Sequence, residues 1–127
     1  MDWTFRGDQP IYAQLMQRIK QGIVSGDLPP GSRLPSVREL ATEAGVNPNT
    51  MQRALQELER EGMVYSQRTA GRFVTEDVNL IEGTKRAFAA EHIRVFLEGM
   101  GSLGYGREEI LALLQEEKEE DNGNSGM

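Results

Sequence analysis

Apolar residues recur at helical spacing near the start of the chain. Four of them follow one another at intervals of four positions and mark one face of a helix: Ile11, Leu15, Ile19 and Ile23. Pro10 suits the first helical position, because the N–H that it lacks would have no partner there. Gly26 can adopt the left-handed conformation that ends a helix. The pattern predicts a helix over residues 10–25.

Two shorter helical patterns follow, separated by Gly45. Ser36 and Glu39 form a capping box that opens the first of them. Its apolar face consists of Val37, Leu40, Ala41 and Ala44. Asn47 can cap the next helix, which has Pro48 at its first position. The buried stripe of that helix consists of Met51, Ala54, Leu55 and Leu58. Two short helices joined by a tight turn predict a helix-turn-helix that ends near Gly62.

Strand-forming residues come directly after these helices. Residues 63–66 and 72–75 are the two strand candidates, and residues 67–71 form a loop of hairpin length with a glycine near its exit. A helix-turn-helix followed by a hairpin is typical of a winged helix, in which the hairpin is the wing. We therefore expect a mainly α fold with a small β-hairpin, in which residues 1–75 form a winged helix-turn-helix domain.

From residue 76 the apolar positions spread around much of one long helix, predicted over residues 77–99. They are Leu80, Ile81, Ala87, Phe88, Ile93, Val95, Phe96, Leu97 and Met100. Gly99, Gly101 and Gly104 are expected to break this helix, and a last helix opens at residues 107–109. A segment of about 45 residues cannot bury so wide an apolar surface by itself.

This segment either folds back on the first domain or pairs with a second copy of itself. We favour a homodimer through residues 76–120, because two-fold pairing is the commonest way to cover such a surface. Residues 121–127 are polar and rich in glycine, so we expect a disordered tail there. The predicted organisation is a winged helix-turn-helix domain, a two-helix dimerisation segment and a short tail.

The composition excludes most catalytic and metal-binding chemistry. The 127 residues include no cysteine and a single histidine, His92. No phosphate-binding glycine loop and no nucleophile–base pair can be recognised. We therefore expect no enzyme activity, no catalytic residue, no cofactor and no metal. The charged N-terminus does not resemble a signal peptide, and no apolar run is long enough to span a membrane, so we expect a soluble, cytoplasmic protein.

The net charge of −6 argues by itself against a nucleic-acid partner, but the charge is unevenly distributed. Residues 1–75 carry a net charge of +1 and residues 76–127 a net charge of −7. At 100° per residue, the outward face of helix 47–61 carries polar and basic side chains: Asn49, Gln52, Arg53, Gln56 and Arg60. The acids Glu57, Glu59 and Glu61 are expected on its flanks and toward its end.

Several motifs together resemble the GntR family of bacterial transcription regulators. They occur in order at residues 10–12, 31–41, 46–50 and 53–62, with the sequences PIY, GSRLPSVRELA, VNPNT and RALQELEREG. The Asn-Pro-Asn-Thr form and the short helical C-terminal segment resemble the YtrA-type branch, whose C-terminal segment serves dimerisation. The resemblance covers about residues 9–75.

The resemblance implies a sequence-specific DNA-binding regulator that binds double-stranded DNA. It implies base contacts from Arg38 and from the start of the recognition helix, and minor-groove contact from the wing. The candidate DNA-binding residues are Arg33, Ser36, Arg38, Asn47, Asn49, Thr50, Gln52, Arg53, Gln67, Arg68 and Arg72. We expect a dimeric repressor that places two recognition helices on an inverted-repeat operator.

Other interpretations stay open at this point. The wing has fewer glycines than many relatives over residues 69–72, so its entry into the minor groove is undecided. Arg33 and Arg38 could pair with surface acids instead of DNA, and Asn47 is first of all a helix cap. The alternative function is a winged-helix protein-interaction module with incidental DNA binding. No residue marks a site for a small-molecule effector, so the existence of an effector also stays open.

Overall fold

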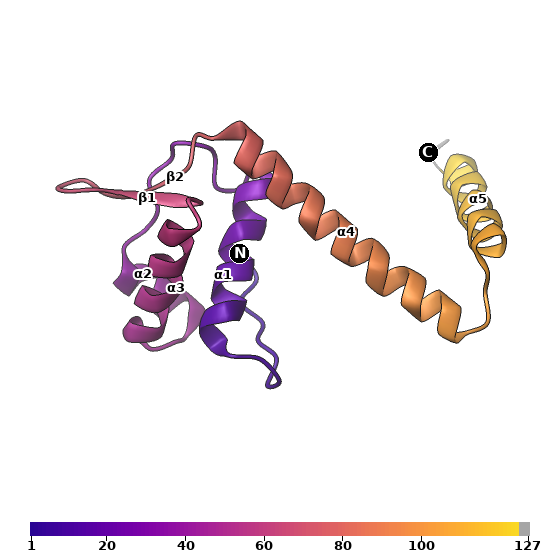
Figure 1. Cartoon of the computed structure of the whole chain (residues 1–127), viewed down its shortest axis with the longest axis horizontal. Coiled ribbons are helices and arrows are strands. Elements are labelled where there is room, and N and C mark those ends of the chain that lie inside the picture. Colours follow the sequence, from indigo (N-terminus) through magenta and orange to yellow (C-terminus); the bar gives the residue numbers. More distant parts are fainter. Residues whose placement is uncertain (125–127) are drawn as a thin grey trace. The chain divides into compact units, whose positions relative to one another are not determined.

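The computed structural model describes the backbone of residues 1–124 and the side chains through residue 117. Five helices and one antiparallel hairpin follow one another along the chain (Figure 1). Their bounds are α1 Ile11–Ser25, α2 Val37–Ala44, α3 Pro48–Arg60, β1 Val64–Gln67, β2 Gly71–Val74, α4 Val78–Ser102 and α5 Arg107–Asn124. The expected mainly α fold with a winged helix-turn-helix is confirmed.

The helix-turn-helix forms where the local signals place it. The Ser36 hydroxyl accepts a hydrogen bond from the Glu39 N–H at 3.1 Å, which is one half of the predicted capping box. The reciprocal bond from the Glu39 side chain is not formed in the described structure. Gly45 has φ +70° and ends α2, and the Val46 N–H then bonds the Ala41 carbonyl at 3.0 Å. This pair of features is the Schellman motif, which turns the chain directly into α3.

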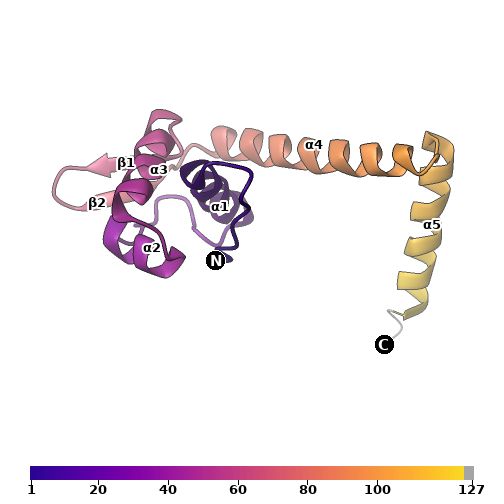
Figure 2. The ribbon, with the colours of Figure 1, turned by 90° about the horizontal axis from the view of Figure 1, so that it is seen from below.

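The hydrophobic core of the first unit lies between α1, α2, α3 and the hairpin (Figure 2). Both α1 and α2 pack against α3, and β1 also contacts α3. The largest fully buried side chains are Leu15, Ile19, Ile23, Met51, Leu55, Leu58, Met63, Val64 and Val74. The stripes predicted for α1 and α3 are therefore the faces that meet. Burying one face of α3 leaves its opposite face in solvent.

The hairpin has a third partner that the sequence analysis did not identify. Within the hairpin, Val64 pairs with Val74 and Gln67 with Gly71, so three residues form the loop. Residues 31–34 run along the other side of β2, where Arg33 forms a bridge with Phe73. The Leu34 N–H bonds the Arg72 carbonyl and the Val74 N–H bonds the Ser32 carbonyl, each at 2.9 Å. The segment is too short, and too close to prolines, to give a strand pattern of its own.

The N-terminal residues are held against the helices. The buried side chain of Gln14 accepts from the Arg6 N–H at 2.7 Å and donates to the carbonyls of Arg6 and Gln9. Trp3 and Phe5 pack against the core, and the Trp3 indole N–H bonds Glu43 at 3.0 Å. The segment before α1 is thus part of the first unit.

Helix α4 is longer than predicted and continues through Gly99 and Gly101 to Ser102. A helix tolerates an isolated glycine at a cost of about 1 kcal/mol relative to alanine, so these two residues weaken the helix without ending it. The end comes at Gly104, where φ is +94° and the following Tyr105 N–H bonds the Met100 carbonyl at 3.1 Å. The expectation that the helix stops at residue 99 is therefore wrong.

The chain divides into two compact units, Met1–Ala87 and Phe88–Met127. The start of α4 belongs to the first unit, because Leu80 and Ile81 pack against its core. In the second unit Ile110 is buried, whereas apolar side chains of α4 and α5 remain exposed. Helix α5 extends to Asn124, into the segment predicted to be disordered, and residues 125–127 lie outside the described part of the chain. None of the helices described is long and apolar enough to cross a membrane.

Candidate nucleic-acid interface

The exposed face of α3 begins at its capped N-terminus. The Asn47 side chain accepts from the Asn49 N–H at 2.7 Å and thus caps the helix, with Pro48 at the first position. Asn49 and Arg53 are exposed, while Thr50 and Gln52 are half-buried. The first two turns of α3 therefore present amide, hydroxyl and guanidinium groups to solvent. These groups are able to hydrogen-bond the edges of bases in a major groove.

The first turn of α2 adds Arg38 to this surface. Arg38 is exposed and follows the N-cap Ser36 by two residues. The hydroxyl of Ser36 is used by the cap, so its predicted contact with DNA would have to come in addition to that bond. Arg38 has no ion-pair partner among the side chains described, and the surface pairing that the sequence left open is not formed.

Arg33 lies beside β2 of the wing, opposite Phe73. Gly71 opens β2 with φ +100°, and a Cβ atom built on it would lie 3.2 Å from Nε of Arg33. The guanidinium of Arg33 thus lies against the glycine backbone, in a space that a larger residue would enter. Gln67 and Arg68 at the hairpin loop are exposed. The wing therefore has one cation beside β2, against Gly71, and another in its loop.

We expect Gly71→Ala to lower the free energy of unfolding by about 1–2 kcal/mol, because a non-glycine residue is strained at positive φ. The added methyl group would also displace Arg33. Gly83→Ala is the matched control, since Gly83 lies inside α4 with open space around its Cα. That control should stabilise the protein by about 0.5–1 kcal/mol. Thermal unfolding of both variants measures the difference, and equal melting temperatures would contradict the role assigned to Gly71.

Arg72, unlike the other candidates, is engaged inside the protein. Its Nε donates to Glu59 Oε1 at 2.5 Å, and Ser66 Oγ donates to the same oxygen at 2.5 Å. Its Nη1 lies 3.5 Å from Oε1 of Gln52, and only 19% of its side chain is exposed. Arg72 therefore links the wing to α3. The expectation that Glu59 stays on the flank needs correction, because Arg72 connects it to Gln52, which lies two turns earlier on the same side of α3.

The environment of Glu59 also changes its proton affinity. Burial raises the pKa of Glu59, but the hydrogen bonds from Ser66 and Arg72 and the charge of Arg72 lower it more, so the pKa lies below its ordinary value of 4.5. A carboxylate with a lowered pKa stabilises the fold above its ordinary pKa, and this contribution is lost as the pH falls through the native pKa.

We therefore expect Glu59→Gln to cost about 1 kcal/mol or less at neutral pH, since the side chain is partly solvated. The difference in unfolding free energy between the parent protein and this variant should shrink as the pH falls below 4.5. Urea unfolding at a series of pH values tests this. A difference that stays constant down to strongly acidic pH would contradict the role of the ionised carboxylate.

Arg53 stacks on an aromatic ring from another helix. Its guanidinium carbon lies 3.7 Å from the centroid of the Tyr12 ring in α1. This cation–π contact holds the side chain in place without neutralising its charge. Neither this contact nor the role of Glu59 is predicted from the sequence. No sequence signal pairs Tyr12 with Arg53, which are far apart in the chain.

The ion pairs separate the cations of the first 75 residues into two groups. Five are paired with carboxylates: Arg6 with Asp8, Arg18 with Asp2, Lys20 with Glu61, Arg60 with Glu57, and Arg72 with Glu59. The other cations have no ion-pair partner within the described side chains: Arg33, Arg38, Arg53 and Arg68. All four are among the predicted DNA contacts. Within residues 1–75, the unpaired positive charge is thus confined to α2, α3, the wing and the segment of residues 31–34 beside it.

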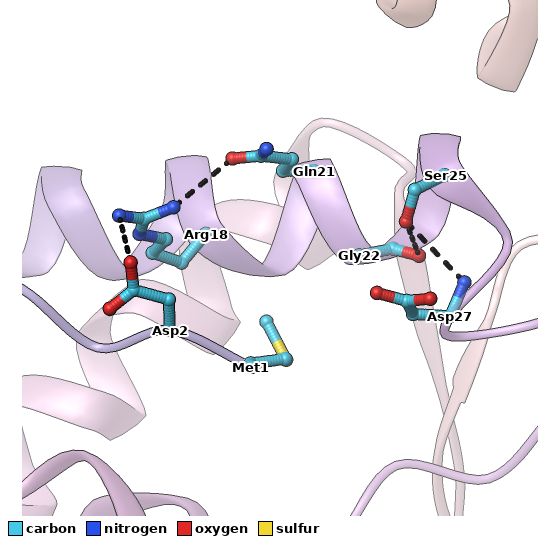
Figure 3. Close-up of a pocket in the computed structure, with 7 residues that line it drawn as sticks. All are labelled: Met1, Asp2, Arg18, Gln21, Gly22, Ser25 and Asp27. Atoms are coloured by element: carbon cyan, nitrogen blue, oxygen red, sulfur yellow. Dashed lines mark hydrogen bonds and ion pairs between the residues drawn. The ribbon is translucent and has the colours of Figure 1, made fainter. Parts of the chain in front are cut away.

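A pocket of about 250 Å³ lies outside this surface, between the N-terminal residues and α1 (Figure 3). The guanidinium of Arg18 lines this pocket. It lies 3.4 Å from the carboxylate of Asp2 and donates to the Gln21 side chain at 3.3 Å. Figure 3 shows these groups turned toward one another. The pocket contains none of the candidate DNA contacts, and its cation is already paired. Among the residues described, no group of acidic, histidine or cysteine side chains could hold a metal ion.

Comparison with known proteins places this architecture among transcription regulators. Residues 11–74 match the family model described as bacterial regulatory proteins, gntR family. An uncharacterized HTH-type transcriptional regulator of Bacillus subtilis, YhcF, is 40% identical over 111 residues, which are 87% of this chain and 92% of the relative. The HTH-type transcriptional repressor YtrA of the same species is 45% identical over 80 residues, covering 61% of this chain and 62% of the relative.

Solved structures agree with these relatives. A GntR family transcriptional regulator from Listeria monocytogenes superposes with a TM-score of 0.79 at 39% identity, over 88% of this chain and 98% of that one. The DNA-binding domain of AraR in complex with operator ORX1 gives a TM-score of 0.53 at 31% identity, over 57% of this chain and 93% of that domain.

Proposed function

Because this chain belongs to the GntR family of bacterial regulatory proteins, whose members are DNA-binding transcription regulators rather than enzymes, we propose that it is a dimeric repressor of transcription. In this proposal it recognises an inverted-repeat operator through α3, Arg33, Arg38 and the wing. The similarity to a named repressor and to a domain solved with operator DNA supports it.

The observation that carries the proposal is the distribution of unpaired cations. Phosphate contacts need positive charges that are not already neutralised by the protein's own acids. Arg33, Arg38, Arg53 and Arg68 meet this condition, whereas the cations elsewhere in the first 75 residues form ion pairs. A protein-interaction module with incidental DNA binding would not require this separation, so the alternative function is less well supported.

Dimerisation is supported by the exposed apolar side chains of the second unit. They include Ile93, Phe96, Leu103, Leu111 and Leu114, whose exposed fractions range from 42% to 72%. Such a surface is usually covered in solution, and a second copy of the same segment would bury both at once. A two-fold dimer would bring two α3 helices to successive major grooves, which matches an inverted repeat.

Selection of bound fragments from genomic and random DNA tests this proposal, followed by footprinting at several salt concentrations. We expect one enriched motif with two-fold symmetry and an affinity that falls with increasing salt. Nonspecific binding should be weak, because residues 1–75 carry a net charge of only +1. Failure to enrich any sequence would instead favour the protein-interaction module. Thermal-shift screening of the same protein would reveal a small-molecule effector, which no residue so far identifies.

A further inference from the structure

The wing and the recognition helix are joined by one chain of polar contacts. Ser66 and Arg72 form a cross-strand pair in the hairpin, and both bind the same carboxylate oxygen of Glu59. Arg72 then reaches the amide oxygen of Gln52, two helical turns before Glu59. Glu59 and Ser66 thus hold Arg72, and Arg72 faces Gln52, which is a candidate base-reading residue.

The chemistry of the guanidinium decides how the Gln52 amide is turned. A guanidinium has only hydrogen-bond donors, so it faces the carbonyl oxygen of an amide and repels the NH₂ group. With Oε1 directed at Arg72, the NH₂ group of Gln52 is directed away from it. A second donor approaching Oε1 would come close to the N–H groups and the positive charge of Arg72. The amide next to Arg72 is therefore suited to donate hydrogen bonds rather than to accept them.

Base edges in the major groove differ in what they require of this amide. Adenine presents an acceptor and an N–H₂ donor, so a glutamine that reads it bidentately must both donate and accept. Guanine presents two neighbouring acceptors, thymine presents one, and cytosine presents a donor. An amide that only donates would thus discriminate against adenine and cytosine.

We propose, as a deepening of the proposed function on which it rests, that Arg72 is a positioning residue that makes Gln52 a hydrogen-bond donor. Gln52 then selects a base whose major-groove edge offers only acceptors, guanine or thymine. This assigns Arg72 a role in base preference, in place of the direct DNA contact that the sequence predicts for it. Glu59 and Ser66 act indirectly, because the carboxylate of Glu59 binds both Ser66 and the guanidinium of Arg72 and holds that guanidinium in place.

The experiment compares the base preferences of variants selected on random DNA. Gln52→Ala locates the relevant position as the one whose preference is lost. In the parent protein we expect guanine or thymine there, favoured by about tenfold or more over adenine. In Arg72→Thr, which keeps a strand-forming residue in β2, the preference at this position should shift toward adenine. Arg6→Thr, which removes an ion-paired guanidinium that is not among the candidate DNA contacts, is the matched control and should leave the preference unchanged.

Each alternative result has a distinct meaning. Adenine or cytosine at the Gln52 position of the parent protein, or an unchanged preference in Arg72→Thr, would overturn the proposal. A uniform loss of affinity in Arg72→Thr, with the salt slope reduced by about one, would instead make Arg72 a phosphate contact. A Gln52→Ala variant with the parental motif would show that Gln52 reads no base. A parent protein that enriches no sequence would contradict the proposed function itself.

A second variant keeps the test valid if Arg72→Thr fails to fold, which thermal unfolding would reveal. Glu59→Ala removes the anchor of Arg72 but introduces a good helix former into α3. We expect the same shift toward adenine, of smaller size, because Arg72 remains present but is less well held. A parental preference in a folded Glu59→Ala variant, with Arg72→Thr unfolded, would also overturn the proposal.

Discussion

Arg38→Ala is expected to weaken binding to the selected operator by about 30-fold or more. A bidentate contact between an arginine and a base contributes about 1–3 kcal/mol, and a two-fold dimer would lose it in both half-sites. Arg38 is exposed on the first turn of α2 and has no ion-pair partner in the described structure, so its guanidinium is available to DNA. Competition binding with operator and scrambled DNA measures the loss, which should be larger for the operator.

Arg60→Ala is the matched control for this prediction. Like Arg38→Ala, it removes one positive charge from the helix-turn-helix. Arg60, however, lies at the end of α3 and pairs with Glu57 at 3.0 Å. We expect a much smaller change in operator affinity, because a largely exposed ion pair contributes little and lies away from the candidate contacts. Equal losses in the two variants would show that net charge, rather than a placed contact, determines binding.

Phe96→Asp is expected to convert the proposed dimer to a monomer and to lower operator affinity by about 100-fold or more, because the two half-sites would no longer be linked. Phe96 is 42% exposed in α4, and the exposed Ile93 lies one turn earlier on the same side of that helix. A carboxylate in the centre of an apolar contact between copies would be buried without a partner. Analytical ultracentrifugation measures the mass of the protein in solution, and a binding titration measures the affinity.

Ala87→Asp introduces the same side chain on another side of α4. Ala87 is exposed and lies on the side that carries the ion pairs of Arg94 with Glu91 and Glu98. We expect this variant to keep the oligomeric state and the operator affinity of the parent protein. If Phe96→Asp remained a dimer, the exposed apolar side chains would have another role, and dimerisation through residues 76–120 would have to be abandoned.

The local parts of the fold could be predicted because their signals lie within a few residues of one another. Ser36 caps α2, Asn47 caps α3, and Gly45 turns the chain between them, each through bonds to neighbouring backbone groups. The apolar stripes of α1 and α3 have the period of the helix and therefore identify the buried faces. The end of α4 could not be predicted in this way, because glycine only weakens a helix and the helix ends through the backbone conformation at Gly104.

The candidate interface could be located from the sequence, but the sequence did not show which of its arginines form ion pairs within the protein. The sequence placed Arg33, Arg38, Arg53, Arg68 and Arg72 together as DNA contacts. The structure leaves four of them unpaired and engages Arg72 with Glu59, a residue on another element. Glu59 and Arg72 are thirteen positions apart in the chain and lie on different elements. Neither the helical nor the strand period predicts a contact between them.

The sequence by itself determined which elements form, which faces of them are buried, and which family the motifs resemble. These properties follow from backbone conformation and from the periodicity of apolar residues, which act over one or two turns. Only the tertiary structure decided which charges remain available and how Gln52 is oriented. Whether a guanidinium meets a carboxylate, an aromatic ring or solvent depends on the packing of distant segments, as with Arg72 and Glu59, Arg53 and Tyr12, and Arg33 at Gly71.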